Sequence, residues 1–175
     1  NVDGNALTLE CAQFGCSVGG LLDLGTGGVL DVNGSSFSIS GTLRLVDGEL
    51  KISTQFSNNG SFSTNEGALV RFDATGLQNL TGTFSGTSNG FQDVIIEEGA
   101  LVDPGGMGTT YTVLGSFTIQ DSQGIPGGQW GDPNEGSGEG EQTSMSYGGE
   151  SFSVQDNSTE SGTPGQFYST EVRFN

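Results

Sequence analysis

The chain has 175 residues, enough for one domain with a single buried core. Its 21 acidic and 4 basic residues give a net charge of −17, which excludes the basic patch that nucleic acid or an anionic membrane would need. The absence of His removes the usual general base, the Ser-His-Asp arrangement and most transition-metal sites.

The composition favours strands and turns over helices. Gly is frequent, with 32 residues, whereas Pro is scarce, with 4. No segment keeps the apolar spacing of a helix for more than about two turns. No apolar run approaches the roughly 18 residues of a membrane span, so we expect no transmembrane segment. The chain begins at Asn1 rather than Met, as after removal of a signal peptide, and we expect an extracellular or cell-surface protein.

Two cysteines lie close together near the N-terminus. Cys11 and Cys16 are the only ones in the chain. In an oxidising compartment an even number of cysteines at short spacing would close a small loop there. We therefore expect a disulfide between them, and two small buried thiols are the alternative.

A short motif then recurs: Gly, any residue, an apolar residue, any residue and usually a second apolar residue. Its clearest copies begin at Gly20, Gly28, Gly41 and Gly48. Gly20 and Gly41 are 21 residues apart, and Gly28 and Gly48 are 20 apart, so two interleaved copies share one period. Weaker copies begin at Gly60, Gly67, Gly99 and Gly115.

A third alternating segment, such as residues 36–40, lies between successive pairs of the motif. Each period therefore holds three short strands with one apolar face, and a Gly at each corner permits a sharp bend. The sequence predicts an all-β fold over residues 1–120, a right-handed parallel β-helix or solenoid with coils of about 20 residues. A β-sandwich is the alternative.

A β-hairpin around Asp47-Gly48 would favour that alternative, because Asp-Gly is a preferred two-residue turn. The hairpin would place Arg44 opposite Lys51, and two like charges destabilise such a pair. Stacking at the repeat period instead places Arg44 over Asp23 and Lys51 over Asp31. The charges therefore favour the solenoid.

A longer passage is similar to a known class of protein. The segment Gly67-Ala68-Leu69-Val70-Arg71-Phe72-Asp73-Ala74-Thr75-Gly76-Leu77-Gln78-Asn79-Leu80-Thr81-Gly82 is followed by Phe91-Gln92-Asp93-Val94-Ile95-Ile96. Both segments resemble β-solenoid repeats of large secreted surface proteins and adhesins of Bacteroidetes, which often carry Asn where this chain has Asp93. The resemblance covers residues 41–119. It implies export and a surface role, and it carries no catalytic residue.

The periodicity stops in residues 121–165, which are rich in Gly, Ser, Glu and Pro. This composition predicts an acidic loop or tether. We expect no cofactor, although carboxylates of this segment are weak candidates for Ca²⁺ ligands without a known ligand spacing. The candidates are Asp132, Glu135, Glu139 and Glu141.

The chain ends in an alternating strand, residues 166–175, with Phe167, Val172 and Phe174 as its inward candidates. Strict alternation cannot place all three on one side, because Phe167 and Val172 are five residues apart. The strand can fold back onto its own domain or add to an exposed edge of another copy. The second outcome predicts that the C-terminal strand contributes to assembly between subunits.

Taken together, these features predict a non-catalytic structural protein, a self-assembling subunit of a surface filament, layer or adhesin stalk. An enzyme such as a polysaccharide lyase is not expected, because Asp23, Asp31, Asp47 and Asp73 lie where solvated surface explains them. The alternative function is a carbohydrate-binding module for a surface polysaccharide. Exposed aromatic rings would suit such a site, and three are candidates. They are Trp130, Tyr147 and Tyr168.

Overall fold

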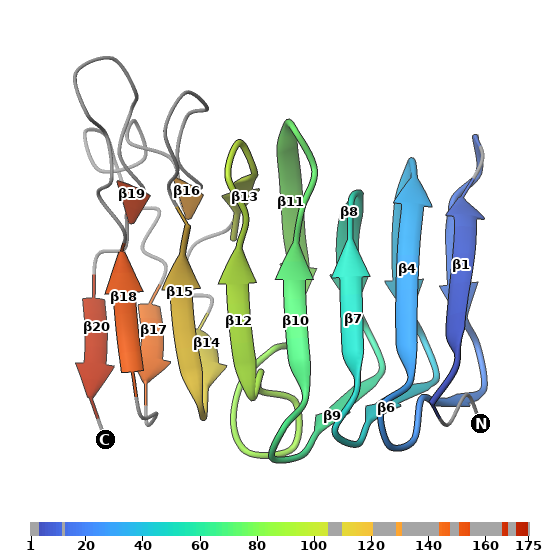
Figure 1. Ribbon diagram of the computed structural model, residues 1–175, viewed down its shortest axis with the longest axis horizontal. Helices are drawn as coiled ribbons and strands as arrows, with labels where there is room; N and C mark the ends of the chain where they lie inside the picture. Colours follow the sequence, from blue (N-terminus) through green and yellow to red (C-terminus); the bar gives the residue numbers. More distant parts are fainter. Residues whose placement is uncertain are drawn as a thin grey trace.

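The computed structural model describes residues 4–11, 13–104, 110–120, 129–130, 144–147, 151–154, 166–167 and 171–174. These residues contain strands and turns and no helix. Every strand pair among the described residues is parallel, and paired strands come from successive coils (Figure 1). The predicted β-solenoid is confirmed.

Two sheets of seven strands run along the long axis of the molecule. The first sheet consists of β1 (Ala6–Cys11), β4 (Val29–Gly34), β7 (Glu49–Ile52), β10 (Leu69–Phe72), β12 (Asp93–Ile96), β15 (Ser116–Ile119) and β18 (Ser151–Val154). The second consists of β2 (Cys16–Val18), β5 (Ser36–Ile39), β8 (Gln55–Asn58), β11 (Leu77–Gly82), β13 (Leu101–Asp103), β16 (Gln129–Trp130) and β19 (Gln166–Phe167).

The third side of the solenoid is made of two shorter sheets. One consists of β3 (Leu21–Asp23), β6 (Thr42–Leu45) and β9 (Ser61–Thr64), and the other of β14 (Thr110–Val113), β17 (Ser144–Tyr147) and β20 (Glu171–Phe174). Between them the fourth coil has no regular strand on this side. Its Phe84 and Phe91 each form an isolated parallel bridge to β14.

The register agrees with the predicted stacking. Leu22 lies opposite Leu43, and Asp23 lies opposite Arg44. Leu43, like Leu24 and Leu45, is fully buried, whereas Leu22 is only partly buried. Asp31 also lies opposite Lys51, as predicted.

The hairpin alternative is wrong. Leu45 ends β6 on the third side, and Leu50 lies in β7 of the first sheet, so the chain turns a corner between them. Asp47 adopts a φ of 51° at this corner. The equivalent residues of the neighbouring coils are Gly27, with a φ of 66°, and Gly67, with a φ of 85°. All three residues precede their first-sheet strand by two positions, and they hold the left-handed conformation that this bend requires.

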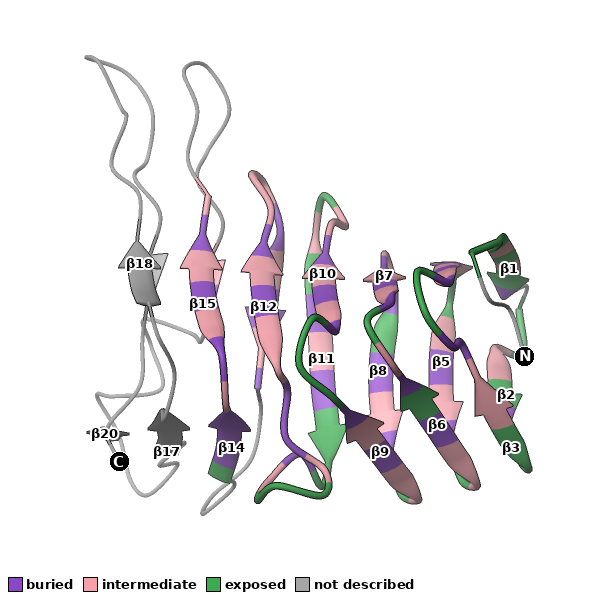
Figure 2. Cartoon of the chain, turned by 60° about the horizontal axis from the view of Figure 1, so that its bottom comes forward, coloured by how far each residue is buried: buried purple, intermediate pink, exposed green. Residues whose placement is uncertain are grey.

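The strands alternate between buried and partly exposed residues, which gives the banding visible in Figure 2. The interior is mainly aliphatic where the first sheet faces it, with Phe72 and Phe117 as exceptions, and aromatic along a central column. Successive ring centroids are 5.7 Å apart for Phe37 and Phe56, 4.9 Å for Phe56 and Phe84, and 6.1 Å for Phe84 and Tyr111. Trp130 continues the column, 5.5 Å from Tyr111. Such pairs add about 0.5–1.5 kcal/mol each beyond burial.

The solenoid extends beyond its predicted C-terminal limit. The segment 121–165 contains β16, β17 and β18, which continue three sheets of the body. Alternation of polar and apolar residues in 144–147 and 151–154 specifies two of these strands, which only three residues separate, but the 13 residues 131–143 lie between β16 and β17. Register spacing along the first sheet accordingly increases from 20 residues between Val29 and Glu49 to 35 between Ser116 and Ser151.

Candidate functional site

The N-terminal end of the solenoid is one candidate for function. Its strands β1, β2 and β3 each end a sheet and pair with one described neighbour, in the second coil. Two apolar side chains of this coil point into solvent: Phe14 is 98% exposed and Leu21 is 70% exposed. Cys11 and Cys16 form a disulfide that closes the loop carrying Phe14, with their Cα atoms 5.1 Å apart.

The three C-terminal candidates occupy different strands. Phe167 belongs to β19, in register with Trp130 of the second sheet. Val172 and Phe174 belong to β20, in register with Met145 and Tyr147 of β17. Strict alternation within one strand could not place Phe167, Val172 and Phe174 on the same side. This difficulty does not arise, because Phe167 lies in a different strand, on a different side of the solenoid. The described pairing of β20 is within its own chain, and β20 is the last strand of its sheet.

A charged cluster lies on the outer face of the first sheet, around Arg71. Its guanidinium forms a 2.7 Å ion pair with Glu49 of the preceding coil and a second ion pair with Glu97 of the following coil. Partial burial alone would lower the pKa of Arg71, but hydrogen bonds and charges from the two carboxylates outweigh it and raise the pKa. The cluster therefore links three coils.

Lys51 lies beside this cluster and differs in part from the prediction. It is in register with Asp31, but its ion pair is with Glu49 of its own strand, at 3.9 Å. Asp31 instead accepts a 3.2 Å hydrogen bond from Asn33. Arg44, in contrast, forms the expected ion pair with Asp23, at 2.8 Å.

The corner between the first and second sheets contains a shallow hollow, the corner notch, lined by residues 34–35, 53–55 and 73–78. It arises from unequal corner lengths. Between aligned interior positions, the second coil has four residues (33–36), the third has three (53–55) and the fourth has seven (73–79). The corner at β7 and β8 consequently ends below the corners on both sides of it (Figure 1).

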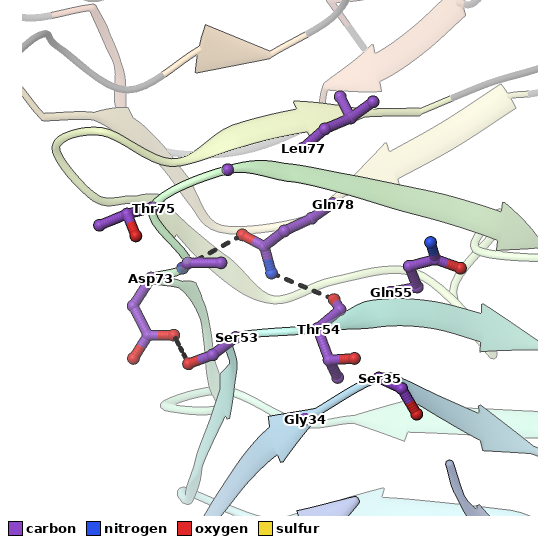
Figure 3. A pocket seen from close by; sticks show the side chains of 11 residues that line it. Gly34, Ser35, Ser53, Thr54, Gln55, Asp73, Thr75, Leu77 and Gln78 are labelled. Carbon is purple, nitrogen blue, oxygen red and sulfur yellow. Dashed lines mark hydrogen bonds between the residues drawn. The ribbon is translucent and has the colours of Figure 1, made fainter. Parts of the chain in front are cut away.

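The corner notch is polar, and hydrogen bonds join several of the residues that line it (Figure 3). Ser53 donates a 2.5 Å hydrogen bond to Asp73. The buried Gln78 amide donates to the carbonyl oxygens of Ile52, at 2.7 Å, and Thr54, at 3.2 Å. The Thr54 hydroxyl is the exception, because its oxygen is buried and has no hydrogen-bond partner among the described residues. Gln55, Thr75 and Leu77 form the exposed rim.

Other sequence candidates lie elsewhere. Trp130 is buried in the aromatic column, which corrects its assignment to an exposed sugar site. The side chain of Tyr147 and all of Tyr168 fall outside the described parts, as do the proposed Ca²⁺ ligands Asp132, Glu135, Glu139 and Glu141. Within the described ranges, no three His, Cys, Asp or Glu side chains gather closely enough to hold a metal ion.

Comparison with protein-family models, curated proteins and solved structures gives no match. None of the described residues forms a helix of the length and apolarity needed to cross a bilayer. Function is therefore inferred from the fold and its side chains.

Sequence reasoning missed the Arg71 cluster and the corner notch. Glu49 precedes Arg71 by 22 residues and Glu97 follows it by 26, close to one repeat in each direction. The repeat length could therefore have predicted that both carboxylates lie near Arg71. The notch depends on corner lengths, which can be counted only once the aligned interior positions of neighbouring coils are known.

Proposed function

We propose that this chain is a non-catalytic structural module of the extracellular space or cell surface, whose copies assemble end to end into a filament, layer or adhesin stalk. The observation that carries the proposal is that β1, β2 and β3 end their sheets at one end of the molecule. Backbone groups along a terminal strand are a template for pairing with another chain. A head-to-tail contact between opposite ends of the solenoid is not self-complementary, so it repeats from copy to copy, and it generates an open fibre where its rotation does not close a ring.

Side chains of the first coil support this role. Phe14 and Leu21 expose apolar surface on the terminal coil, and covering apolar surface stabilises an interface between copies. The net charge of −17 would keep single copies soluble until their ends meet. Surface location rests on this acidity and on the resemblance to secreted solenoid repeats.

Sedimentation velocity and electron microscopy of the purified chain test the proposal. We expect mean mass to rise with protein concentration and elongated particles to form. Leu21→Lys should reduce assembly, because it places an ammonium group in the terminal strand β3, and contact with another copy would strip water from that charge. Ser61→Lys is the matched control, since Ser61 occupies the same outward row of this sheet two coils away. A chain that stays monomeric, or two variants with equal effects, would contradict end-to-end assembly.

A further inference from the structure

We propose that the corner notch is a binding site for a neutral saccharide. The chemical class follows from the lining. Its polar side chains are hydroxyls and amides with a single carboxylate, Asp73, and none of the lining residues is basic, so phosphate, sulfate and other anions find no counter-charge. One carboxylate is also fewer than proteins usually place around Ca²⁺. An apolar ligand would find little surface to cover.

A neutral sugar matches the hydrogen-bonding groups of the notch. Each sugar hydroxyl both donates and accepts hydrogen bonds, as do the Ser and Thr hydroxyls and the Gln amides of the notch. The Asp73 carboxylate adds a charged acceptor, whose Oδ1 already receives the Ser53 hydroxyl. Leu77, 62% exposed at the rim, offers apolar contact to the C–H face of a ring.

Thr54 provides an independent observation. The residue is only 4% exposed, and its hydroxyl oxygen has no hydrogen-bond partner among the described residues. Figure 3 shows this hydroxyl on the side of the notch where Ser35 lies. An unsatisfied buried hydroxyl costs free energy, and a ligand hydroxyl that reached it would recover that cost. Thr54 is therefore a candidate contact for a ligand hydroxyl.

The notch is elongated along the axis of the solenoid. Its lining comes from three successive coils, so it extends along the solenoid axis over about 10 Å, twice the spacing of neighbouring strands. An oligosaccharide lying along the axis would meet side chains from each coil. This binding would be independent of end-to-end assembly, because the notch lies on the side of the solenoid.

Titration of the ¹⁵N-labelled full chain carrying Leu21→Lys, which should reduce assembly and lies outside the notch, tests the site by NMR. The probes are cellotetraose, laminaritetraose, xylotetraose and mannotetraose, each in the millimolar range expected for a shallow site. We expect at least one to shift the amide signals of residues 53–55 and 73–78 in a saturable manner. Gln55→Ala and Thr75→Ala should each weaken binding about fivefold, the loss of one hydrogen bond.

Thr81→Ala is the matched control, because Thr81 is also exposed and lies in β11 outside the notch. It should leave binding unchanged. The proposal is overturned if none of the four probes shifts the notch signals, if the shifts map elsewhere, or if calcium chloride alone produces them. Sedimentation of the same samples reports assembly separately, so the failure of one proposal does not imply failure of the other.

Discussion

Gly41 lies against the backbone of Gly20 in the coil below, so closely that a side chain on Gly41 would meet its carbonyl oxygen. A Cβ at Gly41 would also lie 2.7 Å from the carbonyl carbon of Gly19. We expect Gly41→Ala to lower the free energy of unfolding by about 1–3 kcal/mol, because the coils must separate to admit the methyl group. Gly20→Ala is the control, since nothing lies within 4 Å of its added Cβ. Equal effects in urea denaturation would contradict this packing.

The two arginine sites should differ in their contribution to stability. Arg71 is 24% exposed and bridges Glu49 and Glu97, whereas Arg44 is 51% exposed and pairs with Asp23. Arg44→Ala should cost less than about 1 kcal/mol, the usual range for an exposed pair. Arg71→Ala should cost more, because it leaves two partly buried carboxylates near each other. Thermal unfolding in low and high salt measures both, and an equal or larger loss at Arg44 would refute the bridging role.

The Thr54 hydroxyl should be dispensable for folding. Thr54→Val removes a buried group without a described partner and keeps the shape of the side chain, so we expect stability to be unchanged or raised. Gln78→Leu removes donors to two carbonyl groups, of Ile52 and Thr54, and should destabilise by about 1–3 kcal/mol. Denaturant midpoints compare the two variants. A marked loss in Thr54→Val would mean that its hydroxyl has a structural partner.

The disulfide should be present in native protein. Without reduction, the peptide containing Cys11 and Cys16 should be two hydrogens lighter than its free-thiol form in mass spectrometry. Replacing both residues with Ala should lower stability by about 2 kcal/mol, the magnitude expected for closing so short a loop. Thiols that react with a colorimetric reagent in freshly isolated, folded protein would contradict the disulfide.

Deleting residues 166–175 should leave a folded chain that no longer assembles. The deletion removes β19 and β20, which end two of the sheets at the C-terminal side, but it leaves the described core untouched. Circular dichroism reports the remaining β-structure, and electron microscopy reports assembly. Normal filaments from the truncated chain would exclude a role for β20 in assembly, and an unfolded product would mean that the strand mainly completes its own domain.

The sequence predicted the solenoid where successive coils repeat with nearly constant length. Gly20, Gly41 and Gly60 occupy one corner at spacings of 21 and 19 residues, and this regularity made the period visible. Beyond residue 120 the repeat could not be recognised in the sequence, because the segments between strands there differ in length. A two-residue strand such as β16 has no alternation to recognise, and only its in-register neighbours identify it.

The candidate site was less predictable because it depends on differences between coils. Ser53 and Asp73 are 20 residues apart and look like ordinary surface residues in the sequence. Their contact across coils requires the register of β7 and β10, and the hollow beside them requires the short corner that follows Ile52. Repetition reveals the scaffold of such a fold, whereas its sites arise where the repetition is broken.

Stacking of coils also determines how the molecule would respond to tension. Each strand that the structure describes is paired only with strands of adjoining coils, so a pull along the axis would peel coils from an end one at a time. Adjacent coils add only about 5 Å to the length of the rod. The 20 residues from Val29 to Glu49, once peeled and extended, would span about 70 Å. A stalk built from this chain would therefore absorb load as a sequence of large extensions before its covalent backbone bore the full force.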